Sequence, residues 1–181
     1  MKKLARLTAL FLTGALLLVL TACGAAPGGG PNMTPEEIAA KQWLLEEITS
    51  YRTTHDPILA PLVEVEQLSK AEQIWVEQFR TAGKTELPKS KTAETYEEWK
   101  RMTKGWTSCG SYGWGLSQDA SGELSDILFA KVPANTPDGK AELLATLNYH
   151  FAFNNSNCTS IGIAVVTIKG QMYWTCTTFR K

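Results

Sequence analysis

An α+β fold, in which helices pack on an antiparallel sheet, is predicted by the order and spacing of the apolar residues. Helical spacing dominates from residue 34 to 103, and a further helix-like run spans 138–149. Two runs of β-branched and aromatic residues, 160–168 and 171–179, are separated only by the Lys-Gly pair at 169–170, which predicts a hairpin. Helices that precede a terminal hairpin are typical of a single α+β domain.

The first helix is predicted to begin after Thr34. A proline at the first helical position and Glu37 three residues after Thr34 form the pattern of a capping box. Apolar residues then recur along one side of the helix, at Ile38, Leu44, Leu45, Ile48 and Tyr51. The helix should end at about Thr53, because the sequence Asp56-Pro57 disfavours its continuation.

Two more helices are predicted before residue 105. The second spans 66–82, where Gly83 provides a C-terminal stop and apolar residues recur at steps of three or four (Leu68, Ala71, Trp75, Phe79). The polar segment 83–91 is predicted to be a loop. A shorter helix is predicted at 93–103 from the spacing of Tyr96, Trp99 and Met102.

The later elements are shorter. Residues 108–117, rich in glycine and aromatics, suit a short strand or a bulged edge. Residues 125–132 are compatible with either a short helix or a strand. The helix at 138–149 is expected to be capped by Asp138, and the hairpin follows it.

Residues 1–22 have the pattern of a signal peptide. Lys2, Lys3 and Arg6 precede an apolar run from Leu7 to Leu20, and small residues follow. The apolar run is too short to cross about 30 Å of hydrocarbon comfortably as a helix. This order favours a processed leader over a permanent transmembrane anchor.

The segment 20–23, Leu-Thr-Ala-Cys, resembles the lipobox of bacterial lipoproteins. The resemblance implies cleavage before Cys23 and attachment of diacylglycerol and further fatty acid, such as palmitate, to that residue. Several acyl chains would hold the protein at the membrane of a bacterial cell envelope, facing the periplasm or the exterior. Residues 23–33, rich in glycine and proline, are predicted to be a flexible linker, and 34–181 to be the domain.

Charge and length limit the possible functions. Of the 18 basic residues, three lie in the leader, so 15 remain against 18 acidic ones and the mature chain carries a net charge of −3. No basic patch follows from this balance, and no nucleic-acid partner is expected. The 159 residues after the leader suffice for one domain with a hydrophobic core.

Cys109, Cys158 and Cys176 are the disulfide candidates, because disulfides are typical of exported proteins. Three cysteines allow one bridge and leave one free thiol. A two-residue turn at 169–170 places Cys176 opposite Ile163, too far along the hairpin from Cys158 for a bridge. Cys109 is therefore the expected common partner. Cys158 is the preferred second cysteine because it lies at the start of its strand.

Four segments, in the same order, resemble the CAP superfamily (cysteine-rich secretory proteins, antigen 5, pathogenesis-related 1), particularly its bacterial secreted branch. They are LEEITSYRTTHDPILAPL at 45–62, YGWGLS at 112–117, LATLNYHFAFNNSNCTSIGIA at 144–164 and MYWTCTTF at 172–179. The resemblance covers residues 42–179 and implies an α-β-α sandwich. It also implies that Arg52 ties the first helix to a neighbouring loop.

The family's site is incomplete in this chain. Full members place two histidines and two glutamates in a central cleft that binds a divalent cation. Trp114 stands where a glutamate of that site is expected, Gly115 replaces an asparagine, and Leu144 replaces a tryptophan. His150 alone matches the site, so neither a metal nor another cofactor is expected.

His150 and His55 are both expected to have structural roles. No acidic residue occurs from 143 to 181, and no GxSxG motif marks Ser156, Cys158 or Ser160 as a nucleophile. His150 is therefore interpreted as a hydrogen-bonded residue at a helix end rather than a general base. His55, beside Asp56, is expected to complement the C-terminal end of the first helix.

The aromatic residues suggest a binding cleft. His150, Trp114, Tyr112 and Tyr149 are its candidate residues, although most aromatics of the chain are expected in the core. Three functions stay open: non-catalytic binding of a small apolar ligand or an envelope partner, hydrolysis of envelope material through His150, and a purely structural surface role. The first is preferred, and the chain is not expected to be an enzyme.

Overall fold

The computed structural model describes residues 32–55 and 59–181. Its helices are α2 (Pro35–His55), α3 (Glu66–Ala82), α4 (Lys89–Met102), α5 (Pro137–Tyr149) and the short α6 (Phe151–Asn154). Its strands are β1 (Val63–Glu64), β2 (Glu86–Pro88), β3 (Thr107–Tyr112), β4 (Trp114–Gln118), β5 (Leu124–Leu128), β6 (Ser160–Ile168) and β7 (Gln171–Arg180). The predicted leader at 1–22, Cys23 and Asp56 lie outside the described residues. Among the helices in the two described ranges, none has the length and apolar character needed to cross a bilayer.

The strands form two sheets. The larger has the order β1-β6-β7-β3 and the smaller the order β2-β5-β4. β1 runs parallel to β6, whereas the other pairs among the described strands are antiparallel, and the predicted α+β class is confirmed. The hairpin has the predicted register, with Ile163 opposite Cys176. Lys169 and Gly170 have φ values of 50° and 80°, as a two-residue turn matched to the strand twist requires.

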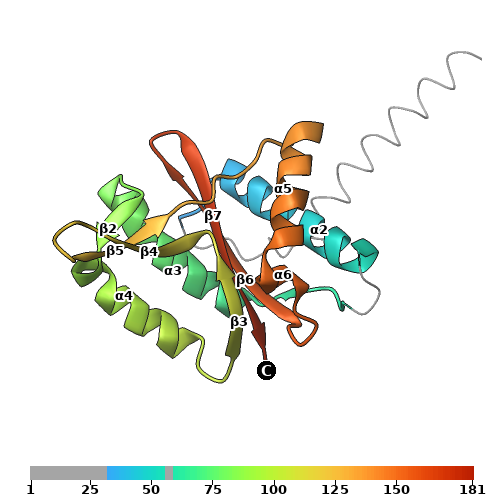
Figure 1. The fold of residues 1–181 in the computed structure, drawn as a ribbon, viewed down its shortest axis with the longest axis horizontal. Helices are drawn as coiled ribbons and strands as arrows, with labels where there is room; N and C mark the ends of the chain where they lie inside the picture. Colours follow the sequence, from blue (N-terminus) through green and yellow to red (C-terminus); the bar gives the residue numbers. More distant parts are fainter. Residues whose placement is uncertain (1–31, 56–58) are drawn as a thin grey trace, which may run out of the picture.

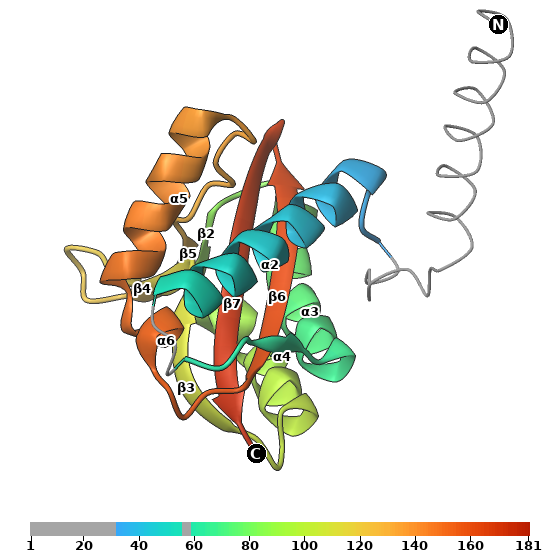
Figure 2. The same cartoon turned by 90° about the vertical axis from the view of Figure 1, so that its right-hand side faces the viewer.

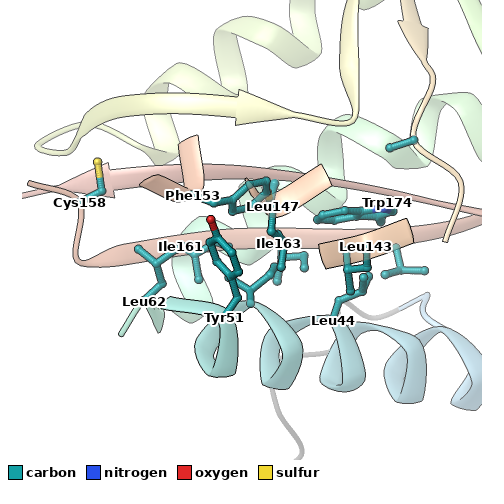
Figure 3. Close-up of a cluster of buried hydrophobic side chains, with 14 residues drawn as sticks. Leu44, Tyr51, Leu62, Leu143, Leu147, Phe153, Cys158, Ile161, Ile163 and Trp174 are labelled. Atoms are coloured by element: carbon teal, nitrogen blue, oxygen red, sulfur yellow. The ribbon is translucent and has the colours of Figure 1, made fainter. Parts of the chain in front are cut away.

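Helices cover both faces of the larger sheet, and β6 is buried between them (Figures 1 and 2). Alternate side chains of β6 point to opposite faces. A first core cluster joins one face to α2, α5 and α6 and includes Leu44, Ile48, Leu143, Leu147, Phe153, Ile161, Ile163 and Trp174 (Figure 3). A second core cluster joins the other face to α3 and includes Trp75, Val76, Phe79, Ala164, Val166 and Ile168. Because both faces are covered, β6 is apolar at nearly every position.

The capping box at the start of α2 is confirmed. The N–H of Thr34 donates to Oε2 of Glu37 at 3.0 Å, and the N–H of Glu37 donates to Oγ1 of Thr34 at 3.3 Å. Glu37 also accepts two hydrogen bonds from Arg80 of α3 and one from the N–H of Thr167 in β6. Burial acts to raise the pKa of Glu37, but these bonds outweigh it and the pKa is lowered. One carboxylate therefore joins α2, α3 and β6.

Two local predictions are wrong. Residues 83–91 are not a loop, because β2 pairs with β5 and α4 begins at Lys89. β2 is an edge strand, where Pro88 is tolerated. Helix α5 is capped by Thr136 instead of Asp138, since Oγ1 of Thr136 accepts the N–H of Gly139 at 3.3 Å. Asp138 lies in the first turn, where a carboxylate complements the helix dipole.

Two undecided segments are strands. Within 125–132, the strand alternative is correct because β5 extends to Leu128. Within 108–117, the chain forms β3 and β4, and the pairing of β3 with β7 shifts between Ser108 and Gly110. The expected bulged edge is therefore confirmed.

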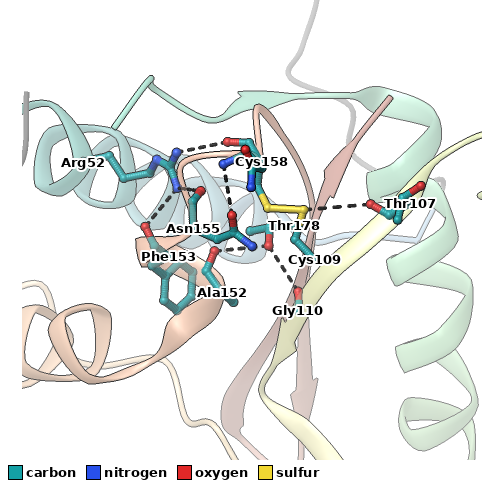
Figure 4. Close-up of a disulfide and its surroundings, with 10 residues drawn as sticks. Arg52, Thr107, Cys109, Gly110, Ala152, Phe153, Asn155, Cys158 and Thr178 are labelled. Carbon is teal, nitrogen blue, oxygen red and sulfur yellow. Dashed lines mark hydrogen bonds between the residues drawn. A yellow bond between two sulfur atoms is a disulfide. The ribbon is translucent and has the colours of Figure 1, made fainter. Parts of the chain in front are cut away.

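A disulfide joins Cys109 of β3 to Cys158, two residues before β6 (Figure 4). Their Cα atoms are 6.3 Å apart, and this is the preferred one of the two pairings that the hairpin register left open. Cys176 is buried and has a free thiol. Because the bridge closes a loop across 49 positions, the chain-entropy model gives it a stabilisation of about 4 kcal/mol.

Arg52, near the end of α2, is fully buried and confirms the expected tie to a neighbouring loop (Figure 4). Its guanidinium donates to the backbone carbonyl oxygens of Ala60 at 2.7 Å, Phe153 at 2.9 Å, Asn155 at 3.2 Å and Cys158 at 3.0 Å. Burial lowers the pKa of Arg52. His55 ends the same helix, and its ring centroid lies 4.6 Å from that of Tyr51.

Replacing Arg52 by lysine should reduce the free energy of unfolding by about 2–4 kcal/mol. A single ammonium group cannot reach all four carbonyl oxygens, and a buried acceptor without a donor costs about 1–3 kcal/mol. Urea denaturation followed by circular dichroism measures the loss. Arg101→Lys is the matched control, because Arg101 is exposed and its ion-pair partner is the neighbouring Glu98. Equal stability of the two variants would contradict this role for Arg52.

Candidate functional site

The four predicted cleft residues do not form one cleft. Tyr112 and His150 lie together, with ring centroids 5.0 Å apart. Trp114 packs instead against the second core cluster, where its ring lies 5.6 Å from that of Trp75. Tyr149 is 95% exposed. The predicted aromatic site is therefore divided between two faces of the molecule.

Gly113 is the reason for this division. It lies between β3 in the larger sheet and β4 in the smaller sheet, with φ of +92°. A Cβ atom at this position would lie 2.1 Å from the carbonyl oxygen of Trp174, so only glycine fits. The chain turns here, and Tyr112 packs on the first core cluster whereas Trp114 packs on the second.

His150 links two helices. It ends α5 and caps α6, where its Nδ1 accepts the N–H of Ala152 at 3.4 Å. Its ring lies 5.0 Å from that of Phe151 and 5.9 Å from that of Phe153. Burial lowers the pKa of His150, which favours the neutral imidazole that can accept this bond.

Neither a metal centre nor a reactive thiol is assembled in the part of the chain that the structure describes. Within residues 32–55 and 59–181, no group of three or more histidine, cysteine, aspartate and glutamate side chains is placed to hold a metal ion. Burial and the nearby Glu72 raise the pKa of the Cys176 thiol, so it stays protonated at neutral pH. His150 has the hydrogen-bonded role at a helix end that its sequence context indicated.

The aromatic pocket is a cavity of about 490 Å³ between α3, α4 and the smaller sheet. Its apolar wall consists of Trp75 of α3, Ala93 and Tyr96 of α4, and Trp114 and Leu116 of β4. Its polar lining consists of Lys89, Thr92, Glu94, Glu97 and Asp126. Only Trp114 among the predicted cleft residues contributes to this pocket.

Aromatic rings from two helices and one strand form most of the apolar wall of the aromatic pocket. The ring of Trp75 lies 6.0 Å from that of Tyr96, and Tyr96 stacks on Trp99 at 5.9 Å with an interplanar angle of 10°. The Trp75 indole nitrogen is buried and has no hydrogen-bond partner among the described residues. The Trp75 ring packs against the rings of Phe79, Tyr96 and Trp114 at interplanar angles of 66°, 66° and 59°, and such inclined contacts are favourable for aromatic pairs.

Glu72 of α3 joins α4 to the larger sheet behind this wall. It is buried on α3, where its Oε1 accepts the indole N–H of Trp99 at 2.9 Å and its Oε2 accepts the hydroxyl of Thr175 at 3.2 Å. Burial raises the pKa of Glu72 to about 7. Because Trp99 stacks on Tyr96, this buried carboxyl group positions one wall of the aromatic pocket.

Comparison with protein-family models and with curated proteins found no match for this chain. Sequence reasoning missed Glu72 and Asp126. A signal existed for Glu72, because it lies four residues after Leu68 and three before Trp75, within the apolar stripe of α3. Asp126 lies in a segment whose secondary structure the sequence left undecided.

Replacing Glu72 by glutamine should remove a pH-dependent part of the stability. The pKa is about 7 in the folded chain and 4.5 for an unperturbed glutamate, so its stabilising contribution is complete below pH 4.5 and is lost as pH rises through 7. Between pH 5 and pH 8, the wild type should lose about 2 kcal/mol of unfolding free energy relative to Glu72→Gln. Urea denaturation at both pH values tests this.

The exposed Glu123 provides the matched control, since Glu123→Gln should follow the wild type at both pH values. If Glu72→Gln and the wild type differ by the same amount at pH 5 and pH 8, Glu72 does not titrate in this range.

Proposed function

We propose that this chain is a lipid-anchored domain of a bacterial cell envelope that binds a small apolar ligand in the aromatic pocket. The pocket carries this proposal. Its volume of about 490 Å³ lies within the range of about 300–1,000 Å³ that is typical of ligand sites, and aromatic rings dominate its wall. The tryptophan that replaces a family glutamate, Trp114, forms part of that wall.

The lipid anchor rests on the sequence. A charged start, a short apolar run, the lipobox at 20–23 and a linker rich in glycine and proline occur in the order of a lipoprotein precursor. The disulfide between Cys109 and Cys158 suits an oxidising compartment outside the cytoplasm. A CAP-like architecture is part of the same proposal, and the α+β class with helices on both faces of the larger sheet supports it.

A binding role is favoured over hydrolysis through His150. The Nδ1 atom of His150 is engaged by a backbone N–H, and aromatic rings surround the imidazole. A general base needs a nucleophile within hydrogen-bond reach and a third group that orients it. The contacts of His150 are instead those of a helix cap.

Replacing Leu116 by glutamate should weaken binding of an uncharged apolar probe at least tenfold. Leu116 lines the pocket and is 53% exposed, so the variant is expected to fold. A carboxylate there would have to lose water beside the ligand, which costs more than the 1.4 kcal/mol that corresponds to tenfold. Titration with N-phenyl-1-naphthylamine, followed by its fluorescence, measures the affinity.

Leu124→Glu is the matched control for this experiment. Leu124 is 38% exposed in the same small sheet and does not line the pocket, so its replacement should leave the affinity unchanged. The proposed binding site would be wrong if both variants bound the probe as tightly as the wild type, or if the wild type did not bind it.

Replacing Cys23 by alanine should abolish lipidation. The expected anchor is a thioether on this sulfur, so cells that express the variant should incorporate no labelled fatty acid into the protein. The wild type should carry the label and fractionate with the membrane. Label and membrane association that persist in Cys23→Ala would remove the basis for the anchor. Cys176→Ala tests whether the loss is specific to Cys23.

A further inference from the structure

We infer that the aromatic pocket selects apolar ligands that carry a positive charge, such as alkylammonium compounds. The inference rests on the proposed function, because it specifies which ligand the same pocket takes. The aromatic pocket combines a buried carboxylate with an aromatic wall. Each of these two features favours a cation.

Asp126 lies on the apolar wall of the pocket rather than at its edge. It is directly opposite Leu116 in the pairing of β4 with β5. Directly paired residues share one face of a sheet, and so do residues two apart in a strand. Trp114, Leu116 and Asp126 therefore lie side by side on the face of the small sheet that borders the pocket. A ligand that touches the tryptophan and the leucine lies next to the carboxylate.

Asp126 has no cationic partner in the part of the chain that is described. It is 97% buried, and the Thr92 hydroxyl donates a hydrogen bond to its Oδ2. No lysine, arginine or histidine of residues 32–55 and 59–181 forms an ion pair with it. A buried carboxylate usually has a cation beside it, so an ammonium group of the ligand would complete this site.

The other charges of the pocket lining largely cancel. Glu94 and Glu97 are acidic, and Lys89 is the one basic residue of the lining. Glu97 pairs with Lys100, whereas Glu94 and Lys89 are both exposed and largely offset each other. Charges exposed to water are screened, but a buried one acts through a medium of lower dielectric constant. Asp126 therefore determines the sign of the electrostatic potential at the apolar wall of the pocket.

The aromatic rings favour a cation as well. The ammonium nitrogen of Lys100 already lies 5.2 Å from the centroid of the Tyr96 ring. Trp75, Tyr96 and Trp114 contribute π-systems to the pocket, and tryptophan faces bind alkylammonium groups best among aromatic side chains. An anionic amphiphile of the same length would gain the apolar contacts but would be repelled by Asp126.

Three ligands with the same alkyl chain test the inference: octyltrimethylammonium, octanol and octanoate. Residues 32–181 are suitable for the titration, because both core clusters and the disulfide lie within this segment. Calorimetry should show that the cation binds about tenfold more tightly than octanoate, with octanol between them. Asp126→Asn should reduce the ratio of cation to octanoate affinity to about twofold.

A second variant keeps the test decisive if Asp126→Asn does not fold. Glu94→Gln changes an exposed residue and should reduce the preference for the cation about twofold at low salt, whereas Glu123→Gln, outside the pocket, should leave it unchanged. Octanol and octanoate that bind as tightly as the cation would overturn the inference and leave the proposed function intact. Failure of all three ligands to bind would overturn both.

Discussion

The buried guanidinium of Arg52 is the interaction on which the arrangement of one side of the molecule depends. The segment between α6 and β6 and residues 59–62 contain little regular structure, so their carbonyl oxygens need donors from elsewhere. Arg52 supplies donors to Ala60, Phe153, Asn155 and Cys158 from a single rigid group. A guanidinium keeps its charge even when burial lowers its pKa, so these hydrogen bonds persist over the pH range in which the protein is folded. The disulfide at Cys158 and the start of β6 are thereby held against α2.

The elements that the sequence predicted correctly are those fixed by neighbouring residues. The turn at 169–170 determines the register of β6 and β7, and the capping box at Thr34 determines where α2 begins. The elements that it missed depend on distant partners. β2 is a strand because β5 lies beside it. Asp138 is a residue type that often caps helices, and it was therefore the predicted cap of α5. The N-cap position is instead that of Thr136, directly before the proline at the first helical position, and its side chain accepts the N–H of Gly139.

The candidate site shows the same contrast. Trp114 was predicted to line a cleft, because by the resemblance to the CAP superfamily it stands where a glutamate is expected, and it does line the pocket. Its partners could not be recognised, since the chain turns at Gly113 from the larger sheet into the smaller one, and a positive φ leaves little trace in the sequence beyond the glycine itself. Tyr112 and His150 consequently belong to another face. The position of Glu72 within the apolar stripe of α3 indicates a buried carboxyl group, but nothing near it in sequence indicates its partner, the indole of Trp99 on α4.

The position of the β6–β7 hairpin in the chain has a consequence for biogenesis. Both core clusters require this hairpin, yet it follows every helix of the described chain. Until it has been synthesised, α2, α3 and α5 lack the sheet faces on which they pack, and isolated helices of this length are marginal in water. If the precursor is exported as proposed, it therefore stays unfolded, and able to pass through a secretion channel, until β6 and β7 have been made. The described domain would then fold on the far side of the membrane.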